Sequence, residues 1–225
     1  MPAFFARHER GRAIIEGADA RHLARSLRAR PGEEIEVIDP EGFMLTVRLD
    51  QVSVSRVEGT VVSQRPHQPE PQARITIAIA NLPAPALELV LSRCTEAGAF
   101  AFVVFEADRS VGRGEKLERW NTIAREAAML AGRLVIPEVS AASSADAAIG
   151  AEDFPVMLQR DSPQRLADVT EPRDIALFIG PEGGWSEREL NLGESSASLG
   201  PRNLRAETAA LVGLAIALSV RGDLR

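Results

Sequence analysis

The chain is poor in the residue types that build disulfides and metal sites. It has 1 cysteine and 3 histidines among 225 residues. A single cysteine, Cys94, cannot form an intramolecular disulfide, which favours a reducing, cytoplasmic location. The histidines, His8, His22 and His67, lack the spacing of metal ligands, so we expect no metal.

Long apolar runs are also missing. The longest apolar stretch, residues 209–220, is interrupted by Gly213 and Ser219. A membrane-spanning helix needs about 20 such residues, so this stretch predicts a buried helix of the core and no membrane contact. The first residues do not show the charged-then-apolar pattern of a signal peptide.

Three common ligand-binding loops are absent from the sequence. No glycine loop is followed by the Gly-Lys-Ser/Thr of a phosphate-binding P-loop, and no G-x-G-x-x-G opens a βαβ unit. The G-x-S-x-G turn of a hydrolase is missing as well. The common nucleotide-binding and hydrolase sites are therefore not expected.

Charge is unevenly distributed along the chain. The net charge of −6 argues against a protein that coats nucleic acid indiscriminately. Residues 1–30, however, carry 7 arginines against 3 acidic residues, so this part has a charge of +4 and the remainder −10. Such an N-terminal part could contact phosphates. The alternative is that arginine is simply the usual cation here, because Lys116 is the only lysine.

The N-terminal part of the chain has the periodicity of a small β-rich module. Apolar and polar side chains alternate over residues 34–63, which predicts half-buried antiparallel strands with a tight turn at residues 39–42. The stretch from 64 to 72 contains three prolines and no periodicity. We therefore expect domains at residues 1–68 and 73–225, with a linker at about 64–73.

From Arg74 onward, strand and helix patterns alternate. Strands are predicted at residues 75–80, 100–105, 154–158 and 175–179, and helices at 86–97, 117–131 and 207–220. Ser186 and Glu189 have the spacing of a capping box. Several of the strands are apolar without alternation, which indicates burial on both faces. The pattern predicts an α/β domain with a mainly parallel sheet.

Two glycine–proline loops are the most informative segments. They lie at residues 179–186 and 199–208, each after a predicted strand and before a predicted helix. Glycine lets a ligand approach the backbone closely and leaves amide N–H groups free to bind it. Two such loops side by side can form a nucleotide-sized pocket at the strand ends of an α/β sheet.

Motifs along nearly the whole chain carry a resemblance to a known family. Besides the two loops, they comprise Arg21-His22-Leu23, Leu27-Arg28, Gly32-Glu33, Thr95-Glu96-Ala97-Gly98, Arg109-Ser110, Arg119-Trp120, Ile123-Ala124, Glu126-Ala127-Ala128, Gly132-Arg133 and Pro137. In this order they resemble the ribosomal RNA small subunit methyltransferase E family, within the knotted (SPOUT) RNA methyltransferases. The resemblance implies a PUA-like β-barrel followed by a SPOUT α/β domain with a C-terminal trefoil knot.

The same resemblance implies a function and partners. It implies a homodimer that uses S-adenosylmethionine to methylate N3 of a specific uridine in small-subunit (16S) ribosomal RNA, with the assembled subunit as substrate. The residues implied to bind the cofactor are Ile179, Gly180, Pro181, Glu182, Gly183, Gly184, Leu199, Gly200, Leu204 and Arg205. Those implied to contact RNA are Arg7, Arg21, His22, Arg25, Arg28, Arg109 and Arg133.

Two charged residues at the start of the last helix suit the implied chemistry. Uridine N3 must lose a proton, and that loss places negative charge on the flanking oxygens. Glu207 is the candidate base, and Arg205 is the candidate for orienting the substrate and stabilising the oxyanion. Glu207 could instead stabilise the helix N-terminus electrostatically. Arg109 and Arg133 could likewise form structural ion pairs instead of RNA contacts.

Departures from the family pattern leave other functions open. Leu130-Ala131 stands where the family usually has glutamine and serine, and Ala97 and Ala206 replace leucine and threonine. One alternative is a ribosome-assembly RNA-binding protein without catalysis. Another is a knotted methyltransferase that acts on a different RNA position, such as a ribose 2′-hydroxyl of transfer RNA.

Overall fold

A computed structural model describes residues 3–112 and 114–224, except for the side chain of Arg7. Its internal contacts divide the chain into two compact units. The first unit comprises Met1–Glu70 and Ala128–Val135, and the second comprises Pro71–Ala127 and Ile136–Arg225. The α/β class with an N-terminal β module, expected from the periodicity, is confirmed.

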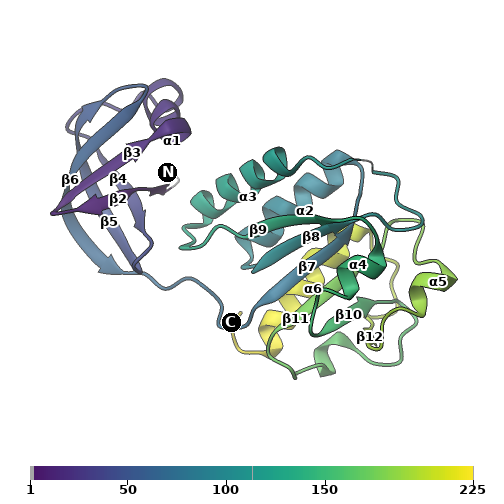
Figure 1. Ribbon diagram of the computed structural model, residues 1–225. Coiled ribbons are helices and arrows are strands. Elements are labelled where there is room, and N and C mark those ends of the chain that lie inside the picture. The colour runs from purple at the N-terminus through teal and green to yellow at the C-terminus, as the bar shows by residue number, and fades with distance from the viewer. Residues whose placement is uncertain (1–2, 113, 225) are drawn as a thin grey trace. The chain divides into compact units, whose positions relative to one another are not determined.

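The first unit is a curved sheet with short helical turns (Figure 1). Its strands run in the order β1-β4-β5-β6-β3-β2, where β1 is parallel to β4 and the other neighbouring pairs are antiparallel. The elements are β1 (Phe4–Phe5), β2 (Arg7–Glu9), β3 (Arg12–Glu16), α1 (Gly17–Arg21), the π-helical η1 (His22–Ser26), β4 (Glu34–Asp39), β5 (Phe43–Val52) and β6 (Arg56–Pro66).

As expected from the alternation of apolar and polar residues, the apolar side chains of β4 and β5 form the core of this unit. Ile35, Val37 and Leu45 are buried on one side of the sheet, where they pack against Phe4 and Leu23. The predicted turn is confirmed, since the N–H of Gly42 donates to the carbonyl of Asp39 at 3.0 Å and Gly42 has a φ of 97°. A positive φ of this kind suits glycine, which has no Cβ to clash.

Two features of the first unit differ from the expected boundaries. β6 continues to Pro66, which pairs with Phe43, so the stretch expected as a linker begins within a strand. Proline is tolerated there because, of the described strands, only β5 pairs with this end of β6, so its other side is an open edge. Residues 128–135 also group with this unit, where Met129 joins the core.

The second unit is built around a sheet of six parallel strands in the order β12-β10-β11-β7-β8-β9 (Figure 1). Its elements are β7 (Ile75–Ala80), α2 (Ala84–Glu96), β8 (Ala101–Phe105), α3 (Leu117–Ala131), β9 (Glu138–Ala142), α4 (Ala145–Ile149), β10 (Pro155–Leu158), η2 (Leu166–Asp168), β11 (Ile175–Ile179), α5 (Glu187–Leu190), β12 (Ser196–Ala197) and α6 (Ala206–Val220).

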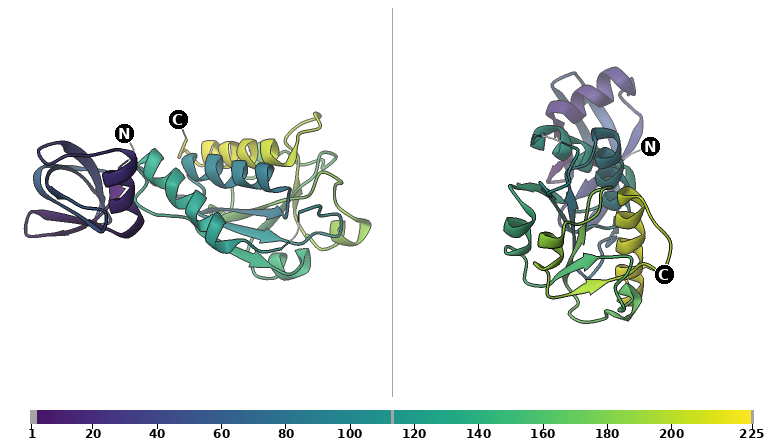
Figure 2. Two further views of the ribbon diagram at one scale, coloured as in Figure 1. Left: turned by 90° about the horizontal axis from the view of Figure 1, so that it is seen from above. Right: turned by 90° about the vertical axis from the view of Figure 1, so that its right-hand side faces the viewer.

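Both faces of this sheet are covered, which explains its continuous apolar strands. In β11, Leu177 and Ile179 face a cluster that includes α2 and α6, whereas Phe178 faces a second cluster that includes α4. Figures 1 and 2 show α2 and α6 side by side on one face of the sheet.

Helix α6 lies close to the strands. A Cβ at Gly213 would lie 3.1 Å from Cδ1 of Leu158 and 3.4 Å from Cδ1 of Leu177, so glycine allows the helix to approach the sheet. In the described part of the chain, no helix is long and apolar enough to span a membrane.

Candidate functional site

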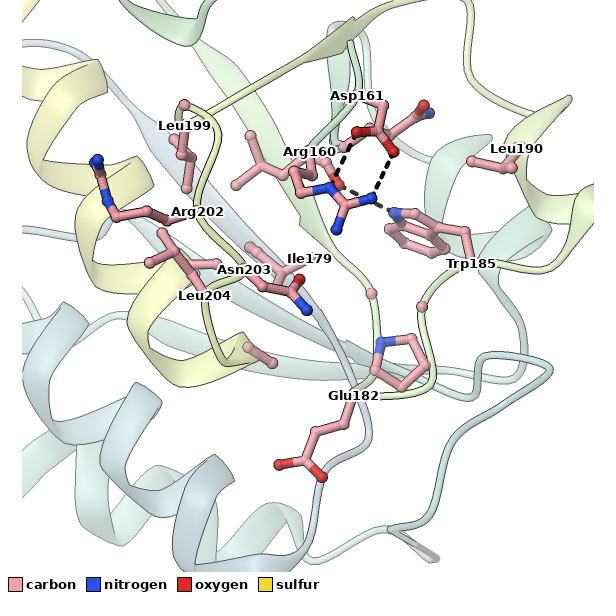
Figure 3. Close-up of a pocket in the computed structure, with 18 residues that line it drawn as sticks. Arg160, Asp161, Ile179, Glu182, Trp185, Leu190, Leu199, Arg202, Asn203 and Leu204 are labelled. Carbon is pink, nitrogen blue, oxygen red and sulfur yellow. Dashed lines mark hydrogen bonds and ion pairs between the residues drawn. The ribbon is translucent and has the colours of Figure 1, made fainter.

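A cavity of about 460 Å³ lies where three neighbouring parallel strands end (Figure 3). The strands β12, β10 and β11 are adjacent, and the segments that follow their carboxyl ends line it. The lining residues are Leu158, Gln159, Arg160, Asp161, Ile179, Gly180, Pro181, Glu182, Gly184, Trp185, Leu190, Leu199, Gly200, Arg202, Asn203, Leu204, Ala206 and Ala209. Ligand sites of open α/β sheets are found at this edge.

The loop after β11 owes its shape to its glycines and to Trp185. A Cβ at Gly180 would lie 2.9 Å from Cε2 of Trp185, so no other residue fits without a shift. The loop turns at Gly184, which has a φ of 70° and donates its N–H to the carbonyl of Pro181 at 2.8 Å.

Trp185 fixes one wall of the cavity. Its ring stacks on Phe105 with the centroids 6.0 Å apart and the planes at 3°, and its indole N–H donates to the carbonyl of Leu158 at 3.1 Å. The structure gives it a packing role that also shapes the cavity.

The loop after β12 forms the opposite wall. Leu199, Gly200 and Leu204 line the cavity, and Gly200 has a φ of 104°. In Figure 3, the amide of Asn203 points toward the middle of the cavity and the carboxylate of Glu182 points away from it. The two glycine–proline loops expected to lie side by side therefore face one shared cavity.

The predicted cofactor-binding residues fall into two groups. Those that line the cavity are Ile179, Gly180, Pro181, Glu182, Gly184, Leu199, Gly200 and Leu204. Gly183 and Arg205 do not line it. Gly183 packs against Arg109 instead. A Cβ added to this glycine would lie 3.3 Å from the Cβ of Arg109.

A pair of charged lining residues was missed from the sequence. Arg160 and Asp161 follow β10 after one intervening residue, and two hydrogen bonds of 3.0 Å each join their guanidinium and carboxylate groups (Figure 3). This pairing lowers the pKa of Asp161. Their position after the predicted strand 154–158 was a usable signal, because the carboxyl ends of parallel strands meet at one edge.

A capped helix anchors the end of the loop after β11. Ser186 caps α5 by accepting from the N–H of Glu189, and the Glu189 carboxylate accepts from the N–H of Ser186 in return. The predicted capping box is confirmed. Glu189 is fully buried, and its other carboxylate oxygen accepts from the N–H of Asp108 at 2.9 Å.

The two candidate catalytic residues lie at the start of α6. Arg205 is the exposed N-cap residue, and its side chain does not cap the helix. Glu207 lies in the first turn, and its Oε2 is buried without a hydrogen-bond partner among the described residues. Neither residue lines the cavity, although Ala206 between them does.

The predicted N-terminal RNA contacts lie on one short helical segment, apart from Arg7. Arg21, His22 and Arg25 belong to α1 and η1, Arg28 follows them, and all four are exposed. Within residues 3–112 and 114–224, none of these side chains forms an ion pair with a carboxylate. The side chain of Arg7, in β2, lies outside the described part of the structure.

The remaining two predicted RNA contacts have other partners. Arg133 is 5% exposed, and its guanidinium is hydrogen-bonded to the Glu70 carboxylate, which corresponds to the structural alternative. Arg109 is exposed and donates to the carbonyls of Gly183 and Trp185. Burial of Arg133 inside an ion pair leaves it unsuited to a surface contact.

The arrangement suits an organic ligand with both apolar and polar parts. Leucine, isoleucine and tryptophan side chains line it together with carboxamides and backbone groups. Among the described residues, no group of three or more histidine, cysteine, aspartate or glutamate side chains could hold a metal ion.

Comparison with known families identifies both parts of the chain. Residues 68–218 match the RNA methyltransferase domain, and residues 15–44 match the RNA methyltransferase PUA domain. The chain is 30% identical to ribosomal RNA small subunit methyltransferase E of Bacillus subtilis, over 93% of this chain and 90% of that protein. It is 32% identical to the protein of the same name from Synechocystis, over 88% of this chain and 70% of that protein.

Solved structures show the same similarity. Ribosomal RNA small subunit methyltransferase E from Neisseria gonorrhoeae, bound to S-adenosyl methionine, superposes with a TM-score of 0.83 and 26% identity, over 96% of this chain and 95% of that one. A protein from Legionella pneumophila, in complex with the bound cofactor SAM, gives a TM-score of 0.86 and 25% identity, with 96% of each chain covered.

Proposed function

The chain belongs to the ribosomal RNA small subunit methyltransferase E family, and we propose that it methylates N3 of one uridine in small-subunit (16S) ribosomal RNA with S-adenosylmethionine. The observation that carries this proposal is the cavity between the two glycine–proline loops, at the carboxyl ends of β10, β11 and β12. Relatives with bound S-adenosyl methionine share this fold over nearly the whole chain.

The residues of the cavity fit this cofactor. Its volume of about 460 Å³ is in the range of small-molecule sites. Gly180 gives the Trp185 ring room to form one wall, and Ile179, Leu199 and Leu204 supply apolar contacts for an adenine ring. The amide of Asn203 and the backbone of the two loops supply polar partners.

The two charged residues at the start of α6 would perform the proton chemistry. S-adenosylmethionine supplies an activated methyl group when bound, so the protein has to align the uridine with it. Glu207 has a buried carboxylate oxygen without a hydrogen-bond partner, and we assign it the removal of the N3 proton. Arg205 orients the uracil and stabilises the negative charge on its oxygens.

The first unit would hold the RNA. Arg21, His22, Arg25 and Arg28 form an exposed basic segment, with Arg7 as a further contact. We propose residues 1–68 as the RNA-binding domain and residues 73–225 as the methyltransferase domain. For Arg133 we propose a structural role, through its ion pair with Glu70, in place of an RNA contact.

We also propose that the active form is a homodimer located in the cytoplasm. Helix α6 carries a single charged residue, Glu207, in 15 residues, and Leu211 is exposed on it. An apolar helix that is only partly covered is typical of a subunit interface. The basic N-terminal segment and the single cysteine are consistent with a ribosomal RNA substrate in a reducing compartment.

The test is a methylation assay on the natural substrate. The purified protein is incubated with methyl-labelled S-adenosylmethionine and small ribosomal subunits from a strain that lacks this gene. The RNA is then digested, and its nucleosides are identified by mass spectrometry. Subunits from the parent strain, which already carry the modification, are the control.

Each outcome decides between the candidate functions. Label in 3-methyluridine, with no label in the control subunits, would establish the enzyme and its chemistry. Label in another nucleoside would keep the cofactor and change the target. An absence of label, together with tight RNA binding, would favour a ribosome-assembly protein without catalysis.

A further inference from the structure

Arg109, in the loop after β8, is hydrogen-bonded to the loop after β11, which lines the cavity. Its Nη1 donates to the carbonyl oxygen of Gly183 at 3.0 Å and to that of Trp185 at 3.1 Å. A Cβ at Gly183 would lie 3.3 Å from the Cβ of Arg109, so the two segments are packed closely at this point.

Asp108, the preceding residue, adds a second set of contacts. Its carboxylate accepts from the hydroxyl of Ser186 and from Nη2 of Arg188 at 2.8 Å. Its own N–H donates to Glu189, as described above. The hydrogen bond from Arg188 is the main reason why the pKa of Asp108 is lowered, with a further contribution from Ser186.

Arg109 packs against a residue of the loop that does not line the cavity. Glu182 and Gly184 line the cavity, whereas Gly183 between them does not line it and gives its carbonyl to Arg109. The carbonyl of Trp185 is held by the same nitrogen, while its ring forms a wall of the cavity. One guanidinium therefore fixes the backbone on both sides of Gly184.

We propose that Arg109 is a positioning residue, which holds the loop at 180–186 in the shape that binds S-adenosylmethionine. This rests on the proposed function, because it assigns the cavity to that cofactor. Glycine-rich segments lose much conformational freedom when they are ordered. A loop that is already ordered before the ligand arrives binds it more tightly. Arginine suits this role because its guanidinium offers several donors in a fixed plane.

This role differs from the direct RNA contact expected for Arg109 from the sequence. Both hydrogens of Nη1 have an acceptor in the loop, which accounts for the direction of the side chain without RNA. The two roles predict different measurements, since a positioning residue affects cofactor binding even when RNA is absent.

The experiment compares cofactor binding by the full-length wild type and the Arg109→Ala, Arg109→Lys and Arg119→Ala variants. Dissociation constants for S-adenosylmethionine are measured by calorimetry without RNA, and those for small-subunit ribosomal RNA by filter binding. Arg119→Ala is the matched control, because this exposed arginine also makes two hydrogen bonds, to Glu88 of α2, which does not line the cavity.

We expect Arg109→Ala to weaken cofactor binding about tenfold, which corresponds to ~1.4 kcal/mol, and to leave RNA binding unchanged. In turnover assays, the KM for the cofactor rises while kcat at saturation is kept. Arg109→Lys recovers part of the affinity, because an ammonium group can still donate to the two carbonyls. Arg119→Ala matches the wild type.

Two results would overturn the inference. One is normal cofactor affinity in Arg109→Ala with weakened RNA binding, which would make Arg109 a direct RNA contact. The other is normal affinity for both ligands. Failure of the proposed cofactor site is distinguishable, since the wild type itself would then bind no S-adenosylmethionine, and a different target nucleoside would show in the methylation assay and not in this binding comparison. Circular dichroism confirms that each variant is folded, and Arg109→Lys tests the inference even if the alanine variant is not.

Discussion

Among single residues, Glu207 has the most direct consequence for the chemistry. Its carboxylate stands in the first turn of α6, with one buried oxygen that has no hydrogen-bond partner among the described residues. Leaving such an oxygen without a partner is unfavourable in a folded protein. In the proposed reaction, the N3–H of uridine would be the donor that satisfies it.

Glutamine at this position tests that role. Glu207→Gln keeps the shape of the side chain and removes its basicity, so we expect turnover to fall about 10²-fold or more with cofactor affinity kept. Glu118→Gln is the control, because Glu118 is likewise the second residue of a helix, α3. If both variants lose only a little stability and neither loses turnover, Glu207 acts on the helix N-terminus alone.

Cys94 illustrates the opposite case, a reactive residue type made inert by its position. It is fully buried on the core-facing side of α2, and burial raises the pKa of its thiol to about 12. Since the thiolate is the reactive form, almost none is present at neutral pH.

We therefore expect the native protein not to react with a thiol reagent such as Ellman's reagent between pH 7 and 9. The unfolded protein, in which the thiol pKa returns to its usual range, should react with one equivalent. Rapid reaction of the native protein would contradict the burial of this residue. A Cys94→Ala variant gives the background signal.

At the scale of elements, α5 is too short to be stable without its contacts. It spans Glu187–Leu190, and its capping box joins it to the loop that lines the cavity. The hydroxyl of Ser186, the N-cap residue, also donates to Asp108 in the loop after β8. This one side chain therefore caps α5 and also connects the two loops. The element is thus part of the support of the cofactor site.

Removal of the cap should therefore affect ligand binding as well as stability. We expect Ser186→Ala to lower the free energy of unfolding by about 1 kcal/mol and to weaken S-adenosylmethionine binding severalfold. The control is Ser144→Ala. Ser144 is the N-cap of α4, where its side chain accepts from the N–H of Ala147, and it does not line the cavity. Urea unfolding and calorimetry should show a loss of stability in both variants but a loss of affinity only in Ser186→Ala.

The elements also show what the sequence could and could not reveal. The strand at 175–179 and the helix at 117–131 have the predicted bounds, because their apolar periodicity is strong. Strand β1 escaped prediction, since two residues carry no periodicity and pairing with a distant partner defines it. The strand expected before the second loop was predicted without bounds, because β12 also has only two residues. The helical segment of α1 and η1 was also missed, although it carries the basic residues.

The candidate site shows the same division. The glycine–proline loops revealed the cavity, because Gly200 has a positive φ and Gly180 makes room for the Trp185 ring that forms one wall. The partners of Arg109 and Arg133 could not be foreseen, since each is bonded to residues more than 60 positions away. Arginine alone does not distinguish a surface contact from a structural bond.

For the whole molecule, the division into two units separates the two kinds of binding. The exposed basic segment belongs to the first unit, and the cavity belongs to the second. Phosphate contacts depend strongly on salt because they release the counterions condensed on the nucleic acid, and binding of a small cofactor in the cavity releases none of these. The two affinities should therefore respond independently to substitution.

A triple substitution in the basic segment tests this independence. We expect Arg21→Ala, Arg25→Ala and Arg28→Ala, combined in one chain, to weaken binding of small-subunit ribosomal RNA and to leave S-adenosylmethionine binding unchanged. If each arginine contacts a phosphate, the slope of log affinity against log salt concentration decreases by about 2.

The control removes the same charge from the second unit. Arg93, Arg119 and Arg165 are exposed and already paired with Glu96, Glu88 and Asp168. Their combined replacement by alanine should change RNA affinity much less. An equal loss in both triple variants would mean that RNA responds only to net charge, and the basic segment would then lose its assigned role. A loss confined to the first variant would place the phosphate contacts on this segment, because both variants lose three positive charges.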